Sequence, residues 1–166
     1  WCCFGQEGTD VLVYIGEVAA VKTPGMAKNL LNLLKKAGVS AKVLASEPAS
    51  GVMLGDLMGY TEEVRQQAAA CAKAISETGL PVVVLDSYDA EIMLQKYPEW
   101  GWEITAGVTT ATAYVAKLLE EKKLETKPAL GILGACHDDD RLARTFREFA
   151  PVRTMAQAAG YTLTEM

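Results

Sequence analysis

The chain has 166 residues, of which 50% are hydrophobic and 22% are charged, the composition of an ordinary globular domain. At about 150 residues per domain, we expect one compact unit. The 16 basic and 21 acidic residues give a net charge of −5, which argues against nucleic acid or an anionic membrane surface as the main partner. No apolar run is long enough for membrane insertion, and the four cysteines lack the spacing of a disulfide framework, so we expect a cytoplasmic protein.

Short apolar runs alternate with amphipathic stretches, which is typical of a parallel sheet covered by helices. Thr23 and Pro24 open the first long helix as its cap and first residue, and Gly38 ends it. The elements expected in the first half are a strand at 10–16, a helix at 24–37, a strand at 41–45, a loop at 46–60, a helix at 61–78 and a strand at 81–86.

The second half continues the alternation. It predicts a short helix at 89–96, a strand at 103–105, a helix marked by Val108, Ala111, Val115 and Leu118, a strand at 129–134, helix within 142–159 and a strand at 161–165. The fold class expected is therefore α/β, with a mostly parallel sheet of five or six strands and helices on both faces. Residues 1–9 are expected to be a linker or tail, and 10–166 a single domain.

An internal echo lies within that domain. A strand ending at Gly16, a helix, and a second strand after Gly38 resemble a strand ending near Cys136, a helix, and a second strand after Gly160. Strand–helix–strand echoes are common in α/β proteins. Residues 135–166 nevertheless resemble the start of a second repeat.

A resemblance to a known family is carried by the segments VLVYIGE, KNLLNLLKKAGVSAKVLA, GYTEEVRQQAAACAKAISETG, PVVVLDSYDAEIMLQKYPEW and LGACHDDDRLARTFREFAPVR. Together they resemble the cysteine-rich CCG domain of heterodisulfide reductase subunits and of the iron–sulfur subunit of glycolate oxidase. The resemblance extends from Asp10 to Met166. It implies an oxidoreductase that transfers electrons through an iron–sulfur cluster beside a ferredoxin-like domain or a second CCG domain.

The family's cluster cysteines are substituted at the matching positions, which are Glu17, Ala49, Ser50, Asp86 and Asp89. The spacing fits the family, because 31 residues lie between Glu17 and Ala49 and 35 between Ser50 and Asp86. Cluster ligands surround one point, so we expect these five positions to converge at one end of the sheet. In the second repeat, Cys136 is the only family ligand position that is retained.

Iron–sulfur clusters are held by thiolates, which carboxylates do not replace well. We therefore expect no cluster in this chain and a structural or docking role within the oxidoreductase. One alternative is a divalent-metal site built from Asp86, Asp89, Cys136 and His137. Another is a redox domain that uses Cys136 with cysteines outside this chain. The simplest interpretation of the acidic residues is that they are solvated or cap helices, as Asp86 or Asp89 would.

The remaining cysteines have simpler interpretations. Cys71 lies on the apolar stripe of the helix at 61–78, which indicates packing in the core. Cys2 and Cys3 precede the first strand and are expected to belong to the terminal tail.

Overall fold

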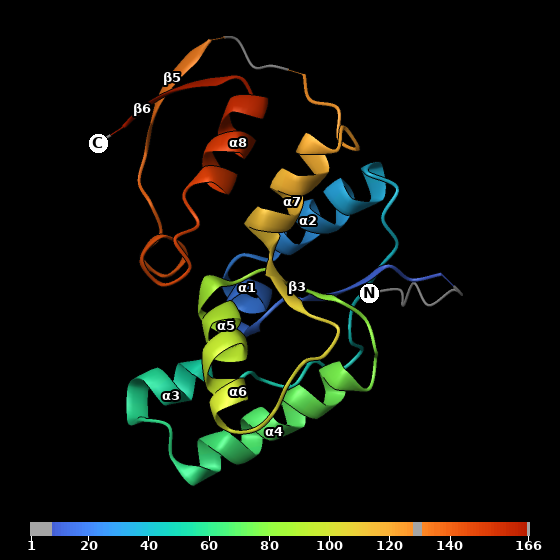
Figure 1. Ribbon diagram of the computed structural model, residues 1–166, viewed down its shortest axis with the longest axis vertical. Helices are drawn as coiled ribbons and strands as arrows, with labels where there is room; N and C mark the ends of the chain where they lie inside the picture. The colour runs from blue at the N-terminus through green and yellow to red at the C-terminus, as the bar shows by residue number, and fades with distance from the viewer. Residues whose placement is uncertain (1–7, 128–130, 166) are drawn as a thin grey trace.

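A computed structural model describes residues 8–127 and 131–165 of the chain and shows an α/β fold (Figure 1). Six described strands pair in parallel, in two sheets of four and two. The larger sheet has the order β2-β1-β3-β4 and consists of β1 (Val11–Tyr14), β2 (Ala41–Lys42), β3 (Val82–Val84) and β4 (Val108–Thr110). The smaller sheet pairs β5 (Ile132–Cys136) with β6 (Tyr161–Glu165). The predicted α/β class is confirmed, with its strands divided between two sheets.

Helices follow most strands, as parallel pairing requires. In chain order they are α1 (Glu17–Lys22), α2 (Pro24–Lys36), α3 (Val52–Met58), α4 (Glu62–Ser76), α5 (Ser87–Glu91), the π-helix η1 (Ile92–Lys96), α6 (Tyr97–Glu99), α7 (Ala111–Glu120), the π-helix η2 (Arg141–Thr145) and α8 (Ala150–Ala158). None of the helices within 8–127 and 131–165 is long and apolar enough to cross a membrane.

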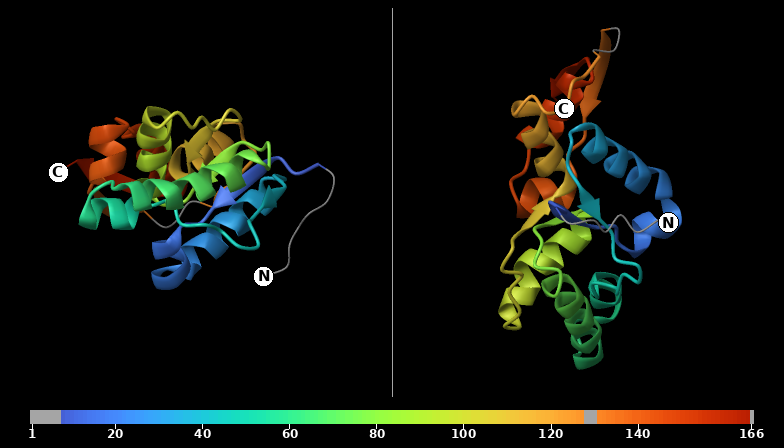
Figure 2. Two further views of the ribbon diagram at one scale, coloured as in Figure 1. Left: turned by 90° about the horizontal axis from the view of Figure 1, so that it is seen from below. Right: turned by 90° about the vertical axis from the view of Figure 1, so that its right-hand side faces the viewer.

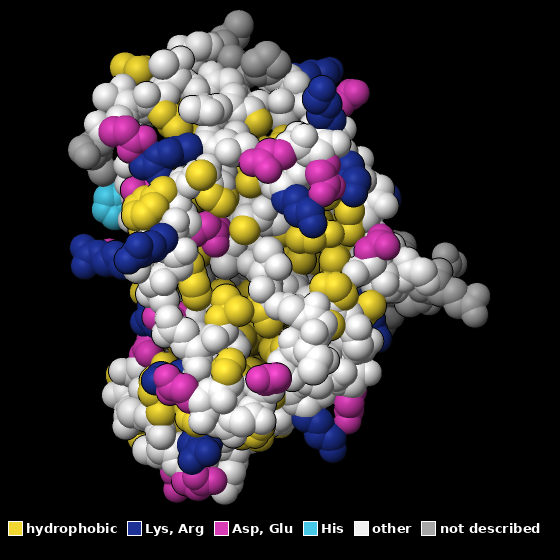
Figure 3. All heavy atoms as spheres, viewed as in Figure 1, with side chains coloured by type: hydrophobic (Ala, Val, Ile, Leu, Met, Phe, Trp, Pro, Cys, Tyr) yellow, Lys and Arg dark blue, Asp and Glu magenta, His cyan; other side chains and the backbone are white. Residues whose placement is uncertain are grey.

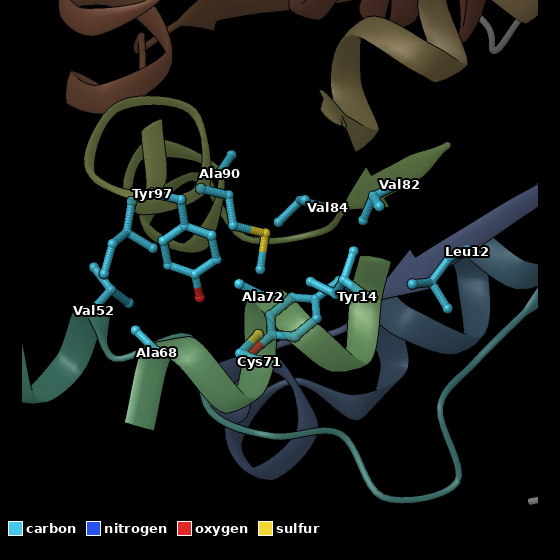
Figure 4. Close-up of a cluster of buried hydrophobic side chains, with 13 residues drawn as sticks. Leu12, Tyr14, Val52, Ala68, Cys71, Ala72, Val82, Val84, Ala90 and Tyr97 are labelled. Carbon is cyan, nitrogen blue, oxygen red and sulfur yellow. The ribbon is translucent and has the colours of Figure 1, made fainter. Parts of the chain in front are cut away.

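The larger sheet is packed on both faces, as predicted. Because side chains alternate along a strand, Leu12 and Tyr14 of β1 face one core, and Val11 and Val13 face the other. The first core is closed by α4 and by the helices from α5 to α6 (Figure 4), and the second by α2 and α7. All four β1 residues are buried, which fits the apolar run VLVY.

Three sequence predictions of local structure were wrong. The expected loop at 46–60 contains α3, in which apolar residues are also exposed and only Val52 and Gly55 are buried, so the sequence gives no helical period. The expected strand at 103–105 is instead an irregular segment with a turn, and the strand is β4. Val108, predicted to belong to the following helix, is the first residue of β4. Thr110 ends this strand and at the same time caps α7 by accepting the N–H of Ala113, so strand and helix follow each other without a loop.

Candidate functional site

The turn after β1 lies against the start of α5. Gly16 has a positive φ of 83°, and a Cβ added to it would lie 2.1 Å from Oδ2 of Asp89 and 3.7 Å from Cβ of Asp86. Glu17 is the next residue and begins α1. Positions that are far apart in sequence thus meet at the carboxyl ends of β1 and β3, where α/β sheets place their sites.

Ser50 joins this group from the loop between β2 and α3. Its hydroxyl donates a hydrogen bond to Oδ1 of Asp89, and both residues are buried. The same hydroxyl accepts the N–H of Val52 at 3.2 Å, and the backbone oxygen of Ser50 accepts the hydroxyl of Tyr97 at 2.9 Å. Ala49, next to Ser50, is half-buried. The structure therefore brings Ser50 and Asp89 into contact beside Asp86 and the Gly16 turn, and Glu17 and Ala49 are the chain neighbours of Gly16 and Ser50.

Two further residues of the site were missed by the sequence analysis. The carboxylate of Glu47 accepts the N–H groups of Ile15 and Gly16 at 2.9 and 2.8 Å. The hydroxyl of Tyr14 donates to the backbone oxygen of Pro48 at 2.8 Å. These bonds hold the loop before α3 across the end of β1. Their only sequence signal is the acidic residue close before the Ala49–Ser50 pair.

The electrostatics of the site favour a protonated acid. The pKa of Asp89 is raised to about 7, mainly by burial; the hydrogen bond from the Ser50 hydroxyl opposes this rise, and the neighbouring carboxylates of Asp86, Glu47 and Glu17 add to it. Burial also raises the pKa of Glu47, against the two backbone N–H donors. The site thus offers hydroxyl, carboxyl and amide groups, which are hard ligands and hydrogen-bond partners rather than the soft ligands of a cluster.

Cys71 lies beneath this site and is fully buried, which confirms the prediction of core packing. Figure 4 shows it on α4 near Tyr14, in the core to which Tyr97 also belongs. Burial raises the pKa of its thiol to about 11, so the thiol is neutral at physiological pH.

Cys136 ends β5 and contacts a different set of residues. Its sulfur lies 3.9 Å from Oδ1 of Asp138, which forms an ion pair with Arg153 at 2.8 Å. His137 is exposed.

The side chain of Asp86 accepts the N–H of Tyr88 at 2.8 Å and so caps α5, in agreement with the simplest interpretation of this acidic residue.

The metal alternative finds no assembled ligand set in the part of the chain that the structure describes. No three or more His, Cys, Asp and Glu side chains within 8–127 and 131–165 are grouped so that they could hold a metal ion. Cys2 and Cys3 lie outside the described residues. Two surface hollows, of about 200 and 340 Å³, are lined by other residues than the five predicted positions.

Comparison with known proteins adds no further assignment. No protein-family model matches the chain, and neither a curated protein nor a solved structure is significantly similar to it. The resemblance to the CCG domain therefore stays a prediction, and any functional proposal depends on the geometry described above.

Proposed function

We propose that this chain is a domain of a heterodisulfide reductase-like oxidoreductase, without a cluster of its own, that positions or docks the electron-transferring parts. The observation that supports this most is the meeting of Glu17, Ser50, Asp86 and Asp89 at one end of the sheet. Their sequence spacing follows the family's cluster ligands, and their side chains provide no thiolate.

The bonding within the site supports a structural role for it. Ser50 and Asp89 form a hydrogen bond in the interior, and the carboxylate of Glu47 accepts two backbone N–H groups. Together these bonds tie the loop before α3 to β1 and to α5. A network of this kind fixes the loop beside α5 and stabilises the domain, which supports a structural role for these residues.

The proposed partners are a ferredoxin-like domain or a second CCG domain of the same protein or complex, in the cytoplasm. The described part of the chain already contains a second strand–helix–strand unit, β5–α8–β6. A docking role is compatible with this arrangement, because two α/β units share one chain and contact each other through α7 and α8.

The proposal is tested by iron analysis after anaerobic purification. The wild-type chain is expected to be colourless, with no stoichiometric iron or zinc. A variant with cysteine at Glu17, Ala49, Ser50, Asp86 and Asp89 is expected to gain visible charge-transfer absorption after reconstitution with iron and sulfide. The matched control carries five cysteines at exposed positions of α2 and α4, and circular dichroism verifies that both variants fold.

Three results would contradict the proposal. Stoichiometric iron in the wild type that is lost in Cys136→Ser would show that this chain holds a cluster of its own through Cys136, in favour of electron transfer. A bound divalent ion lost in Asp86→Asn or Asp89→Asn would favour the metal alternative. Equal iron uptake by the five-cysteine variant and by its control would show that the five positions are not former ligand positions.

A further inference from the structure

The strand β5 has an unpaired edge. In the region that the structure describes, β5 pairs with β6 on one side, from Ile132↔Tyr161 to Cys136↔Glu165, and with no strand on the other. In the right-hand view of Figure 2, the orange start of β5 lies at one end of the molecule. A parallel pair of strands on its own is an unusual arrangement, because parallel sheets are normally covered on both faces.

The larger sheet indicates what belongs on that edge. The pairing Val11↔Ala41 joins β1 and β2 across 30 residues with α2 between them, and Ile132↔Tyr161 joins β5 and β6 across 29 residues with α8 between them. The two units therefore match in strand order, direction and length. On its other side β1 pairs in parallel with β3, whereas β5 has no such neighbour among the described strands.

Exposed apolar side chains on β5 and β6 also indicate that this pair of strands is not fully covered by the described residues. Leu133 is 72% exposed and Ile132 48%, and Tyr161 of β6 is 40% exposed. Helix α8 contacts β6, whereas α2 covers one face of β1 and β2. The opposite face of β1 is closed by α4 and the helices after β3, and no described helix takes this place beside β5.

The sequence of β5 distinguishes a binding edge from a protected one. Natural edge strands avoid pairing by being short or by carrying charged residues. The edge strand β2 has only two residues, one of them Lys42, and β6 ends in Glu165, which pairs with Arg153. In contrast, β5 has five residues, ILGAC, without charge or proline.

We propose that β5 is the central strand of a second parallel sheet and that its free edge binds a strand of an accompanying α/β unit. The partner strand is a short run of β-branched residues like Val82–Val84, added parallel to β5, and an adjoining amphipathic helix covers Leu133 and its neighbours. This inference rests on the strand geometry and not on the proposed function, since it holds whether or not the chain carries a cluster.

The test supplies such a strand in tethered form. The full chain is extended at its C-terminus by a flexible Gly/Ser linker and a second copy of residues 80–86, LPVVVLD, so that the strand is present at about millimolar effective concentration. Amide hydrogen exchange is followed by NMR. The β5 amides that do not bond to β6 are expected to exchange at least about tenfold more slowly than in the untethered chain, while β1 amides stay unchanged. The control tether carries proline at its central valine.

Other results would overturn the proposal. Unchanged exchange in β5, equal protection by the proline-containing tether, or protection of β4 instead of β5 would show that this edge does not accept a strand. A concentration-dependent dimer of the untethered chain with protected β5 amides would assign the edge to a second copy of the chain. Stoichiometric iron in the wild type would contradict the proposed function but would leave this result unaffected.

Discussion

The units β1–α2–β2 and β5–α8–β6 have the same order and nearly the same length, but they differ in burial. Every residue of β1 is buried, whereas Ile132, Leu133 and Ala135 of β5 are exposed. Both strands are uncharged and mostly apolar, so composition does not explain the difference. The first strand lies between two neighbouring strands and two layers of helices, whereas β5 has one described neighbouring strand, β6, which α8 contacts.

The comparison shows that an apolar strand predicts a requirement for burial rather than burial itself. In the first unit the chain meets this requirement through α4, α7 and the helices after β3. On the face drawn in Figure 3, hydrophobic side chains gather in the middle of the molecule, between the upper part that contains α8 and the lower part that contains α4. In the second unit the described residues bury the apolar strand β5 only in part, so the stability of this unit depends on further contacts of β5.

The largest expected effect is a loss of core packing in the first unit. Leu12→Ala removes a side chain that is 0% exposed and is expected to lower the free energy of unfolding by about 3 kcal/mol. Leu133→Ala, the matched change in the second unit, removes a side chain that is 72% exposed and is expected to cost less than about 0.5 kcal/mol. Urea denaturation followed by tryptophan fluorescence measures both changes. Equal losses would show that β5 is as well packed as β1.

A glycine that follows β1 and a glycine in the middle of β5 allow a second comparison. Gly16→Ala places a Cβ 2.1 Å from Oδ2 of Asp89 at a residue with φ 83°, so we expect a loss of about 2 kcal/mol. Gly134→Ala places its Cβ at an ordinary distance of 3.4 Å from the ring of Tyr161, and a change within about 0.5 kcal/mol is expected. Thermal denaturation of both variants decides the matter. A tolerated Gly16→Ala would contradict the close approach of Asp89.

The parts of the fold that the sequence predicted are those with a strong local signal. Helix α2 has a Thr–Pro start and a glycine after its end, β3 is a run of three valines, and β6 matches its predicted range. Helix α3 was missed because Met53, Leu54 and Leu57 are apolar but exposed, which hides the helical period.

The site shows the same limit. The prediction that Glu17, Ser50 and Asp86 converge came from the resemblance to the CCG domain, through their spacing along the chain, and not from a local signal. The contacts of Glu47 were not predictable, because its carboxylate binds N–H groups of residues 31 and 32 positions earlier in the chain. A hydrogen bond over such a separation is set by the packing of the sheet and leaves no periodic signal in the sequence.

A third comparison uses pH. The pKa of Asp89 is raised to about 7 by burial, so between about pH 4, where an unfolded aspartate titrates, and pH 7 the folded state binds more protons than the unfolded state. The free energy of unfolding therefore falls as the pH rises through this range. Asp89→Asn removes the titration and is expected to be about 1–2 kcal/mol more stable than the wild type at pH 8, with no such gain near pH 4.

The second unit provides the control of opposite sign. A hydrogen bond and ion pair with Arg153 lower the pKa of Asp138, so this carboxylate contributes stability at neutral pH that is lost as the pH falls through its folded pKa. Asp138→Asn is expected to be less stable than the wild type at pH 7, and the difference should vanish in acid. Chemical denaturation at several pH values measures both variants. If both substitutions changed the free energy of unfolding in the same direction at neutral pH, the contrast between a buried and an ion-paired carboxylate would be wrong.

The smallest expected effect concerns the contact between the two parts of the chain. Arg141 of η2 pairs with Asp56 of α3 at 2.6 Å and with Glu91 of α5, and its guanidinium lies 4.0 Å from the ring centroid of Tyr88. The arginine is 24% exposed at its side chain, so the ion pairs are screened less than pairs in full contact with water. They connect the segment after β5 to the helices beside the candidate site.

Arg141→Gln is expected to lower the free energy of unfolding by about 1 kcal/mol, since it removes two ion pairs and a cation–π contact at once. The matched control is Arg144→Gln, because Arg144 pairs only with Asp140 among its described contacts, and the two side chains are 84% and 80% exposed. This change is expected to cost less than about 0.3 kcal/mol. At a salt concentration of about 1 M the ion pairs of the wild type are screened, but its cation–π contact and packing are kept. The loss of stability in Arg141→Gln should therefore be smaller at high salt but should not vanish. Equal losses of unfolding free energy in Arg141→Gln and Arg144→Gln would show that Arg141 does not connect the segment after β5 to the helices beside the candidate site.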